Sequence, residues 1–274
     1  MKLIESKAEY IHQEEGLEGI YKMIELAGRT AYHSQDKITP DSANDFVDRI
    51  IKSKHGAALE HGTVYLKFID LADNDVVRYI ENHYSAVGKR LCVTSNLRVL
   101  QENNWLDDLQ YLCSPTEFHE KRYTMRFTCS RAIAQELTRH RIFSFLMESQ
   151  RYINYSKERH GGEITFIEPS WKEEKCPGYF KLRRLCEELE KEYMELIEWG
   201  CTPQQARDIL PNATKTELIM TGFSSDWRHV MDLRLFGKTG APHPDMVDLM
   251  QKAQKAMQEA GIWDDIMSKS SKFE

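Results

Sequence analysis

Basic and hydroxyl side chains alternate with apolar ones in residues 138–152, TRHRIFSFLMESQRY, the most unusual stretch of the sequence. Its polar groups suited to chemistry are Arg139, His140, Arg141, Ser149, Gln150 and Arg151. Guanidinium groups bind phosphates and carboxylates through paired hydrogen bonds, and apolar walls beside them can hold a planar ring. The stretch therefore predicts a buried site for an anionic ligand that carries a ring.

The arginines of this stretch also have a simpler explanation. Residues 130–140 are expected to form a helix with Ser130 as a candidate cap, and basic side chains near a helix C-terminus complement the helix dipole. That effect accounts for Arg139 or Arg141 about as well as a ligand does. It explains less well why Phe143 and further apolar residues lie between the basic and hydroxyl groups.

Several segments together resemble one known family. Residues 139–149 are similar to the RHRx7S signature of flavin-dependent thymidylate synthases, and 149–152, SQRY, continues that likeness. Residues 55–61, HGAALEH, resemble the H-x-x-P-x-E-H block of the family. Residues 206–211, ARDILP, and 231–234, MDLR, are similar to its A-R-x-x-L-P and terminal L-R blocks. The segments also follow in the order that the family has.

The resemblance implies a specific activity. It covers about residues 16–260, although residues 70–120 match no family element that we can place. The family makes dTMP from dUMP, with methylenetetrahydrofolate as carbon donor and FAD reduced by NADPH as hydride source. It forms homotetramers that hold FAD and dUMP between subunits. The implied protein is thus a cytoplasmic homotetrameric flavoenzyme that uses small molecules and binds neither nucleic acid nor membrane.

The resemblance also implies roles for individual residues. The implied FAD contacts are His55, Arg139, His140, Arg141 and His229. The implied dUMP contacts are Glu136, Arg139, Ser149, Gln150, Arg151, Arg207 and Arg234. Ser149 and Arg151 correspond to phosphate-binding positions, and Glu136 to a contact from a neighbouring subunit. Arg234 corresponds to the residue that polarises the uracil ring, and it is therefore the expected catalytic group.

The sequence departs from the family pattern at several positions. Leu146 and Met147 stand where the signature often has Asn-Glu, and the acid of this segment is Glu148, one place later. Ala58 replaces the proline of the H-x-x-P-x-E-H block. A family segment after the last arginine is replaced by 241–246, APHPDM, whose two prolines have no backbone N–H to donate. These departures weaken the assignment of individual contacts more than they weaken the resemblance to the family.

Other possible sites in the sequence have weaker support. His55, Glu60 and His61 lack the HExxH spacing, so we expect no metal site there. Cys176 lies in a polar run without a following histidine and is expected to be an ordinary surface thiol. His243, between two prolines, could be a general base, although a turn residue is the simpler interpretation.

Composition narrows the class of protein. The 274 residues carry 37 Lys and Arg against 43 Asp and Glu, a net charge of −6, which argues against a general nucleic-acid coat. The six cysteines form no CxxC pair, and neither a Walker A nor a GxGxxG run is present. With no signal-peptide pattern at the start, free thiols in a reducing cytoplasm are expected.

One function from a different class stays open on the sequence alone. A non-catalytic nucleotide- or RNA-binding protein could use the same arginine-rich pocket. Phe143, Phe145 and Tyr152 would then stack on bases beside the arginines. The acidic net charge and the single basic cluster disfavour this alternative, and a purified chain that is yellow with bound flavin would decide against it.

Periodicity predicts an α+β fold, in which a mixed or antiparallel sheet is flanked by long helices. We expect one domain, 1–274, with an elaboration at about 70–120. Helices are expected at 16–32, from 40, from 97, and at 130–140, 178–200, 203–210, 227–235 and 246–260; strands at 63–69, 91–94, 121–129, 164–167 and 216–220. Gly28 is a possible helix end, and Pro40 a first helical residue. The helix at 178–200 is expected to bury Leu182, Leu185, Cys186, Leu189, Tyr193, Leu196 and Ile197.

Overall fold

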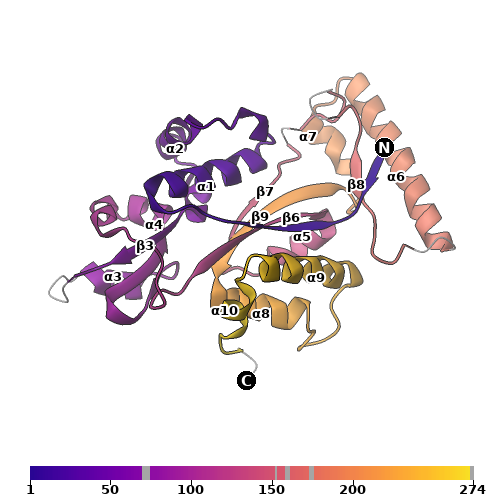
Figure 1. Cartoon of the computed structure of the whole chain (residues 1–274). Helices are drawn as coiled ribbons and strands as arrows, with labels where there is room; N and C mark the ends of the chain where they lie inside the picture. Colours follow the sequence, from indigo (N-terminus) through magenta and orange to yellow (C-terminus); the bar gives the residue numbers. More distant parts are fainter. Residues whose placement is uncertain (70–74, 152, 158–160, 173–175, 272–274) are drawn as a thin grey trace.

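A four-stranded antiparallel sheet forms the centre of the protein (Figure 1). In this computed structural model, which describes residues 1–69, 75–151, 153–157, 161–172 and 176–271, the strand order is β2-β6-β9-β7. The strands are β2 (Lys7–Ile11), β6 (Arg122–Ser130), β9 (Lys215–Phe223) and β7 (Ser144–Met147). The mixed helix and sheet architecture confirms the predicted α+β class.

The two long central strands are largely buried on both faces, and each face is covered by helices. On one face, Met125 and Phe127 of β6 pack against Trp227 and Met231 in a single apolar cluster. The helices of that face are α5 (Arg131–Leu137), α8 (Ser224–Arg234), α9 (Pro244–Glu259) and α10 (Trp263–Met267). The other face lies against α1 (Gly16–Ala31), which contacts β7 and β9.

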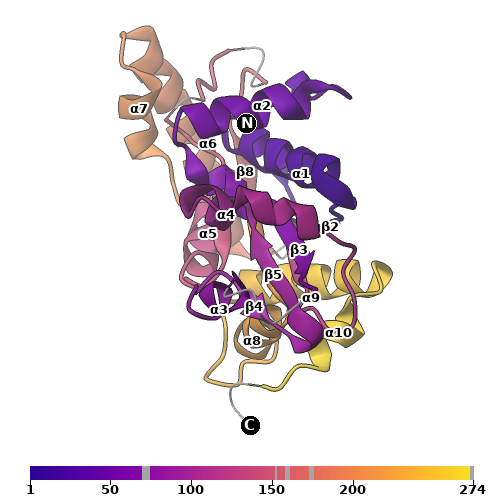
Figure 2. The ribbon, with the colours of Figure 1, turned by 90° about the vertical axis from the view of Figure 1, so that its left-hand side faces the viewer.

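Residues 70–120 contribute to a smaller sheet with its own apolar cluster. Its strand order is β3-β5-β4, and Figure 2 shows β3 and β5 with α4 beside them. The elements are β3 (Thr63–Lys67), α3 (Asp75–Ile80), β4 (Ala86–Val87), β5 (Cys92–Asn96) and α4 (Leu97–Glu102). Ile20 and Ile24 of α1 belong to the same cluster as Val93 and Leu97 of this region. The elaboration is therefore packed onto the first helix.

A third layer lies at the other end of the molecule. The strands β1 (Lys2–Ile4) and β8 (Thr165–Ile167) pair in parallel, beside α6 (Pro177–Glu198) and α7 (Pro203–Ala206). Of the seven residues predicted to form the apolar face of α6, Cys186 and Tyr193 are buried, Leu182, Leu196 and Ile197 are half-buried against the same cluster, and Leu185 is 40% exposed. That prediction is wrong in part because α6 lies at the periphery, where few elements cover it.

One helix boundary differs from the sequence prediction, and one possible boundary is not used. Gly28 does not end α1, which continues to Ala31, next to the predicted end at residue 32. A Cβ at Gly28 would lie 2.5 Å from the Phe46 ring, so the glycine permits the close approach of α2 (Ser42–Lys52). Pro40 lies ahead of α2 and is not its first residue, because Asp41 is the N-cap. Neither residue therefore has the role that its type suggested.

The remaining expected elements are present with small shifts in their ends. Ser130 caps α5 by accepting a hydrogen bond from the backbone N–H of Ile133, as predicted. His243 caps α9 in the same way through its ring, accepting from Asp245, which fits the simpler of its two interpretations. No helix in the described ranges is both long enough and apolar enough to cross a bilayer.

Candidate active site

The structure places Arg234, Glu136 and His140 together. Arg234 is the last residue of α8, while Glu136 and His140 lie at the end of α5 and just after it. The two helices share one apolar cluster on the same face of the sheet, so their C-terminal ends meet. Arg234 Nε donates to His140 Nε2 at 3.1 Å, and Arg234 Nη1 pairs with Glu136 Oε2 at 3.1 Å. Arg234 is 94 positions from His140 and 98 from Glu136 in the sequence, so only folding brings it to them.

His140 is a neutral acceptor in this cluster. Its residue surface is 8% exposed, and burial lowers the pKa of the ring to about 4, with Arg234 and His229 adding repulsion. Because Nε2 accepts from Arg234, this geometry assigns the ring proton to Nδ1. The His229 ring lies edge-on to it, with 6.3 Å between the ring centroids. His140 therefore helps to fix the direction of the Arg234 guanidinium.

Arg139 and Arg141 flank this cluster and are exposed. Within the described residues, neither side chain has an ion pair or a hydrogen bond, so both guanidinium groups are available to an anion. They lie beyond Leu137, the end of α5, and outside its last turn. The helix dipole, which acts mainly within the last turn, therefore explains their presence less well than a ligand does.

Ser149, Gln150 and Arg151 form a second group at the far end of β7. The backbone N–H of Ser149 donates to Ala31 O at 3.1 Å, and its hydroxyl accepts from the N–H of Arg151 at 3.3 Å. Gln150 is buried, with no hydrogen-bond partner for its Nε2 in the described ranges, and Arg151 is exposed. In the chain, β7 lies between this group and His140, and its four residues alone span about 13 Å when extended.

Arg207 lies near this second group, together with an arginine that the sequence analysis missed. Arg131 is half-buried; burial lowers its pKa, and the charge of Arg207 lowers it further, which shows that the two arginines are close. Tyr155 and Glu148 also act on Arg131. A sequence signal was available, because Arg131 begins α5, where the helix dipole disfavours a cation.

Glu148 is buried inside a polar cluster near Ser149. Its carboxylate contacts His33 Nδ1 at 2.7 Å and Lys215 Nζ at 3.1 Å, and it accepts from the backbone N–H of Glu217. Burial alone would raise the pKa of Glu148, but His33 and Lys215 hold it below its usual value. The carboxylate is thus bound by protein groups and is not available for a ligand.

His55 lies in a different cavity, of about 420 Å³, between α1 and the 3₁₀ turn Gly56–His61. The cavity is also lined by Tyr32, Arg98 and Leu146, and the Tyr32 hydroxyl lies 3.5 Å from His55 Nδ1. Leu146 belongs to β7, so this cavity and the two polar groups border the same strand. Within the described residues, no group of three or more His, Cys, Asp or Glu side chains is arranged to hold a metal ion.

His61 lies inside the protein. It is fully buried, and its Nδ1 is 2.8 Å from Thr221 Oγ1, while Nε2 has no hydrogen-bond partner within the described part of the chain. Burial lowers the pKa of His61 to about 3, and the charge of Arg122 lowers it further. The ring is neutral at pH 7 and serves to join the central sheet to the turn that carries it.

This burial predicts a pH dependence of stability. The unfolded chain binds a proton at about pH 6.5, whereas His61 in the folded protein does so only at about pH 3. The stabilisation is complete above the unfolded pKa and is lost as the pH falls towards the folded pKa. Replacing His61 with Asn should therefore reduce the slope of unfolding free energy against pH, between pH 5 and 6, by about 1.4 kcal/mol per pH unit.

Urea unfolding of both proteins at pH 5.0, 5.5, 6.0 and 7.0 measures this slope. The window lies above the range in which Glu148 gains its proton, and His140 contributes equally to both proteins. An unchanged slope in a variant that folds at pH 7 would contradict the burial of a neutral His61.

Comparison with known proteins identifies a family to which this chain is similar. Residues 70–260 match the model of the family described as thymidylate synthase complementing protein. The flavin-dependent thymidylate synthase of Pyrococcus furiosus is 33% identical over 138 residues, which cover 50% of this chain and 53% of that protein. The enzyme of the same name from Corynebacterium glutamicum is 24% identical over 80% of this chain and 68% of its own length. The match to the first thus spans about half the length of the relative.

Among solved structures, a UMP/dUMP methylase PolB from Streptomyces cacaoi, bound with 5-Br dUMP, is also similar. It is 15% identical, with a TM-score of 0.49, over 98% of this chain and 97% of the other.

Proposed function

The chain belongs to the flavin-dependent thymidylate synthase family, the thymidylate synthase complementing proteins, and on that premise we propose that it converts dUMP to dTMP. In this reaction methylenetetrahydrofolate donates the carbon, and FAD reduced by NADPH supplies the hydride. The observation that carries the proposal is the guanidinium of Arg234, oriented by Glu136 and His140 beside the unpaired Arg139 and Arg141.

Arg234 is the group that activates the uracil ring. Its Nε, Nη1 and Nη2 each donate one hydrogen bond inside the protein, which leaves two of its five N–H donors for a ligand. Attack on the pyrimidine ring moves negative charge towards N3 and O4. A guanidinium that is already fixed stabilises this charge without reorganising, and such donors contribute about 3–4 kcal/mol to a transition state. His140 and Glu136 act through Arg234 by holding it in place.

FAD fits the residues around β7. When bound, it supplies the hydride chemistry of the reaction. The cavity beside His55 offers an aromatic wall at Tyr32, an apolar wall at Leu146 and little side-chain volume at Gly28 and Ala58, as a planar ring needs. The flanking Arg139 and Arg141, with no partner in the described chain, suit its phosphates, and His229 lies beside His140 in the same cluster.

The division of the predicted residues into two groups supports a shared site. In a homotetramer, one subunit would supply the Arg234 cluster to the uracil ring. A neighbour would supply Ser149, Gln150 and Arg151, with Arg207, to the phosphate. Exposed apolar side chains such as Phe180 and Trp199, which are 55% and 76% exposed, are consistent with contacts to other subunits. The single domain 1–274 would then act in the cytoplasm, without nucleic-acid or membrane partners.

The RNA-binding alternative has less support from the structure. Phe143 is 4% exposed, and its ring packs edge-on against Trp227, at 4.8 Å between centroids, so it cannot stack on a base. Phe145 packs against the same apolar cluster. Tyr152 lies outside the described residues. Of the three aromatic side chains considered, the two that are described are thus used by the core.

An anaerobic assay tests the proposed function directly. Purified protein with FAD, NADPH, methylenetetrahydrofolate and dUMP should form dTMP, and omission of NADPH, methylenetetrahydrofolate or dUMP should abolish the product. The protein should also be yellow, with a flavin absorption band. A colourless chain that takes up no FAD and forms no dTMP would contradict the proposal, and UMP in place of dUMP would define the sugar preference.

No cysteine is needed for this reaction. Burial raises the pKa of Cys129 to about 12 and that of Cys186 to about 11, so neither is a thiolate at neutral pH. A variant with all six cysteines replaced by Ala or Ser should therefore still form dTMP, after correction for the fraction that folds and binds FAD. A folded variant that is inactive until one particular cysteine is restored would contradict this expectation.

A further inference from the structure

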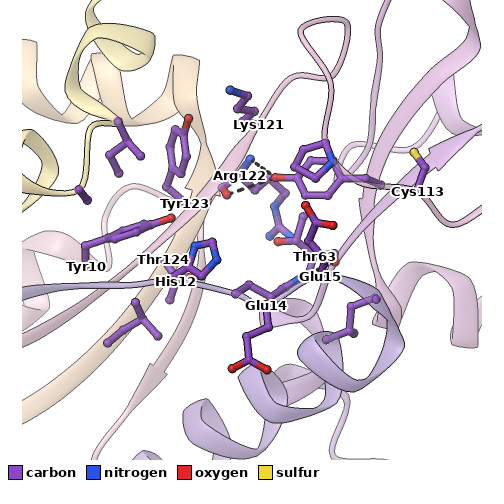
Figure 3. A pocket seen from close by; sticks show the side chains of 18 of the residues that line it. Tyr10, His12, Glu14, Glu15, Thr63, Cys113, Lys121, Arg122, Tyr123 and Thr124 are labelled. Atoms are coloured by element: carbon purple, nitrogen blue, oxygen red, sulfur yellow. Dashed lines mark hydrogen bonds between the residues drawn. The ribbon is translucent and has the colours of Figure 1, made fainter.

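A separate cavity of about 300 Å³ lies between the central four-stranded sheet and the smaller β3-β5-β4 sheet (Figure 3). It is bordered by the end of β2, the start of β6, strand β3 and the segment before α10. None of the residues proposed above for dUMP or FAD lines it. Its walls include the aromatic residues Tyr10, Tyr65 and Tyr123, of which Figure 3 labels Tyr10 and Tyr123 on one side of the cavity.

Arg122 is one of the residues that line this cavity, and Figure 3 labels it between Tyr123 and Cys113. The residue is only 8% exposed, and its guanidinium donates to three neutral oxygens, at distances of 3.1–3.4 Å. These acceptors are Glu60 O, Thr63 Oγ1 and Ser144 Oγ. Its Nε has no hydrogen-bond partner among the residues that the structure describes. In the described part of the chain, no carboxylate forms an ion pair with this buried cation.

The nearby acids do not replace the missing counter-charge. The Glu60 carboxylate pairs with Arg98, and it acts on Arg122 only through space, as does Asp226. At the rim, Glu14 pairs with Lys22, and Glu15 accepts a hydrogen bond from Ser114. Burial lowers the pKa of Arg122 to about 10, which still leaves it protonated at pH 7. A buried charge without a counter-ion is costly, so an anionic ligand would relieve an existing penalty.

Tyr65 and Tyr123 offer their rings rather than their hydroxyls, because both hydroxyls bond within the protein. Tyr123 donates its hydroxyl to Asp265 at 2.8 Å, and the Tyr65 hydroxyl accepts from the backbone N–H of Arg122 at 3.1 Å. The Tyr10 and Tyr123 rings meet edge to face, at 6.2 Å between centroids. A ligand between these walls is therefore recognised by aromatic packing, and its polar group is recognised by Arg122.

We propose that this cavity is a second binding site, for a small planar aromatic ligand whose carboxylate pairs with Arg122. Its volume is at the lower end of the range for ligand pockets and suits a single ring system. The carboxylate supplies the absent counter-charge to the Arg122 guanidinium, and the ring packs against the tyrosines. The inference does not depend on the thymidylate synthase activity, because no residue of that proposed site takes part.

Calorimetric titration of the full chain with benzoate tests the site. Benzoate should bind at least about ten-fold more tightly than uncharged benzamide, because a hydrogen bond to a charged group is the stronger one. It should also bind more tightly than cyclohexanecarboxylate, which has the charge without the aromatic ring. Tyr10→Ala should weaken benzoate binding by about ten-fold, since it removes one wall. Arg139→Ala is the matched control and should leave it unchanged, as should saturating dUMP and FAD.

Arg122→Gln removes the charge, but it also removes a hydrogen bond that joins β6 to β3, so a loss of binding in this variant has two possible causes. A measurement on the unaltered protein therefore tests the site without this variant. Cys113 lines the cavity, whereas Cys201 lies elsewhere, so benzoate should slow alkylation of Cys113 by iodoacetamide and leave Cys201 unaffected. Equal binding of benzoate and benzamide, loss of benzoate binding in Arg139→Ala, or no protection of Cys113 at saturating benzoate would overturn the proposal.

Discussion

Arg234→Ala is expected to lower the rate of dTMP formation at least about a hundred-fold while the protein still folds and binds FAD. The loss corresponds to one fixed donor removed from the charge that develops on the uracil ring, about 3–4 kcal/mol. The fall should appear in kcat and in kcat/KM equally, as it does for a contact made in the transition state. Single-turnover assays with saturating dUMP and reduced enzyme measure it.

The structural role of Arg234 is small enough to be separated from this effect. Its side chain is 23% exposed, and the side chain of its ion-pair partner Glu136 is 36% exposed, so the pair contributes less than about 1 kcal/mol to stability. As the last residue of α8, it also complements the helix dipole, again by about 0.3–1 kcal/mol. Urea unfolding of Arg234→Ala should therefore show a modest change, whereas the activity should show a large one.

Two further variants sharpen the result for Arg234. Arg234→Lys should also be poor, because an ammonium group keeps the charge but loses the planar arrangement of donors. Glu136→Gln keeps the size of the partner and removes its charge, so it should lower kcat by about three- to ten-fold if Glu136 acts by orienting Arg234. A fall of less than about three-fold in Arg234→Ala, too small for a lost transition-state donor, would return Arg234 to a purely structural role.

Local sequence patterns were sufficient to predict the helices and strands that have strong periodicity. The alternation in β6 and the 3.6-residue repeat in α1 and α8 predicted those elements, because their buried faces are continuous. The strand β7 was missed, since its four residues lie among polar side chains and pair only with distant β9. The short strand β2 was missed for the same reason: its partner is β6, more than a hundred residues away.

The candidate site was predictable as a set of residue types but not as a geometry. The spacing of Arg139, His140 and Arg141 marked the loop, but it could not show that His140 accepts from Arg234, which lies 94 residues later. Nor could it show that β7 separates that loop from Ser149. Arg122 gave no signal, because an arginine at the start of a strand is ordinarily exposed, and its burial depends on the packing of β3.

Because β7 lies between the Arg139–Arg141 loop and Arg151, the two can be tested separately, and the second large effect is expected for Arg151. Arg151→Ala should raise the dissociation constant for dUMP by about ten- to a hundred-fold, because a charge-assisted bond to phosphate contributes about 1.5–3 kcal/mol. The FAD content should remain largely intact, since Arg139, His140 and Arg141, three of the implied flavin contacts, precede β7 in the chain, whereas Arg151 follows it. Titration of the oxidised protein with dUMP measures the change. Arg183→Ala, an exposed arginine on α6, is the matched control and should leave the affinity unchanged.

Mixing the two variants tests whether the two groups come from different chains. If each site takes the Arg234 cluster from one subunit and Arg151 from another, random tetramers of the two variant chains contain both intact groups in about a quarter of their sites. Co-refolded Arg151→Ala and Arg234→Ala chains should then recover about that fraction of the activity, although each variant alone has little. If a single chain supplied both groups, every site would lack one arginine, and no activity would return. Unchanged dUMP affinity in Arg151→Ala would contradict its phosphate role whatever the mixture shows.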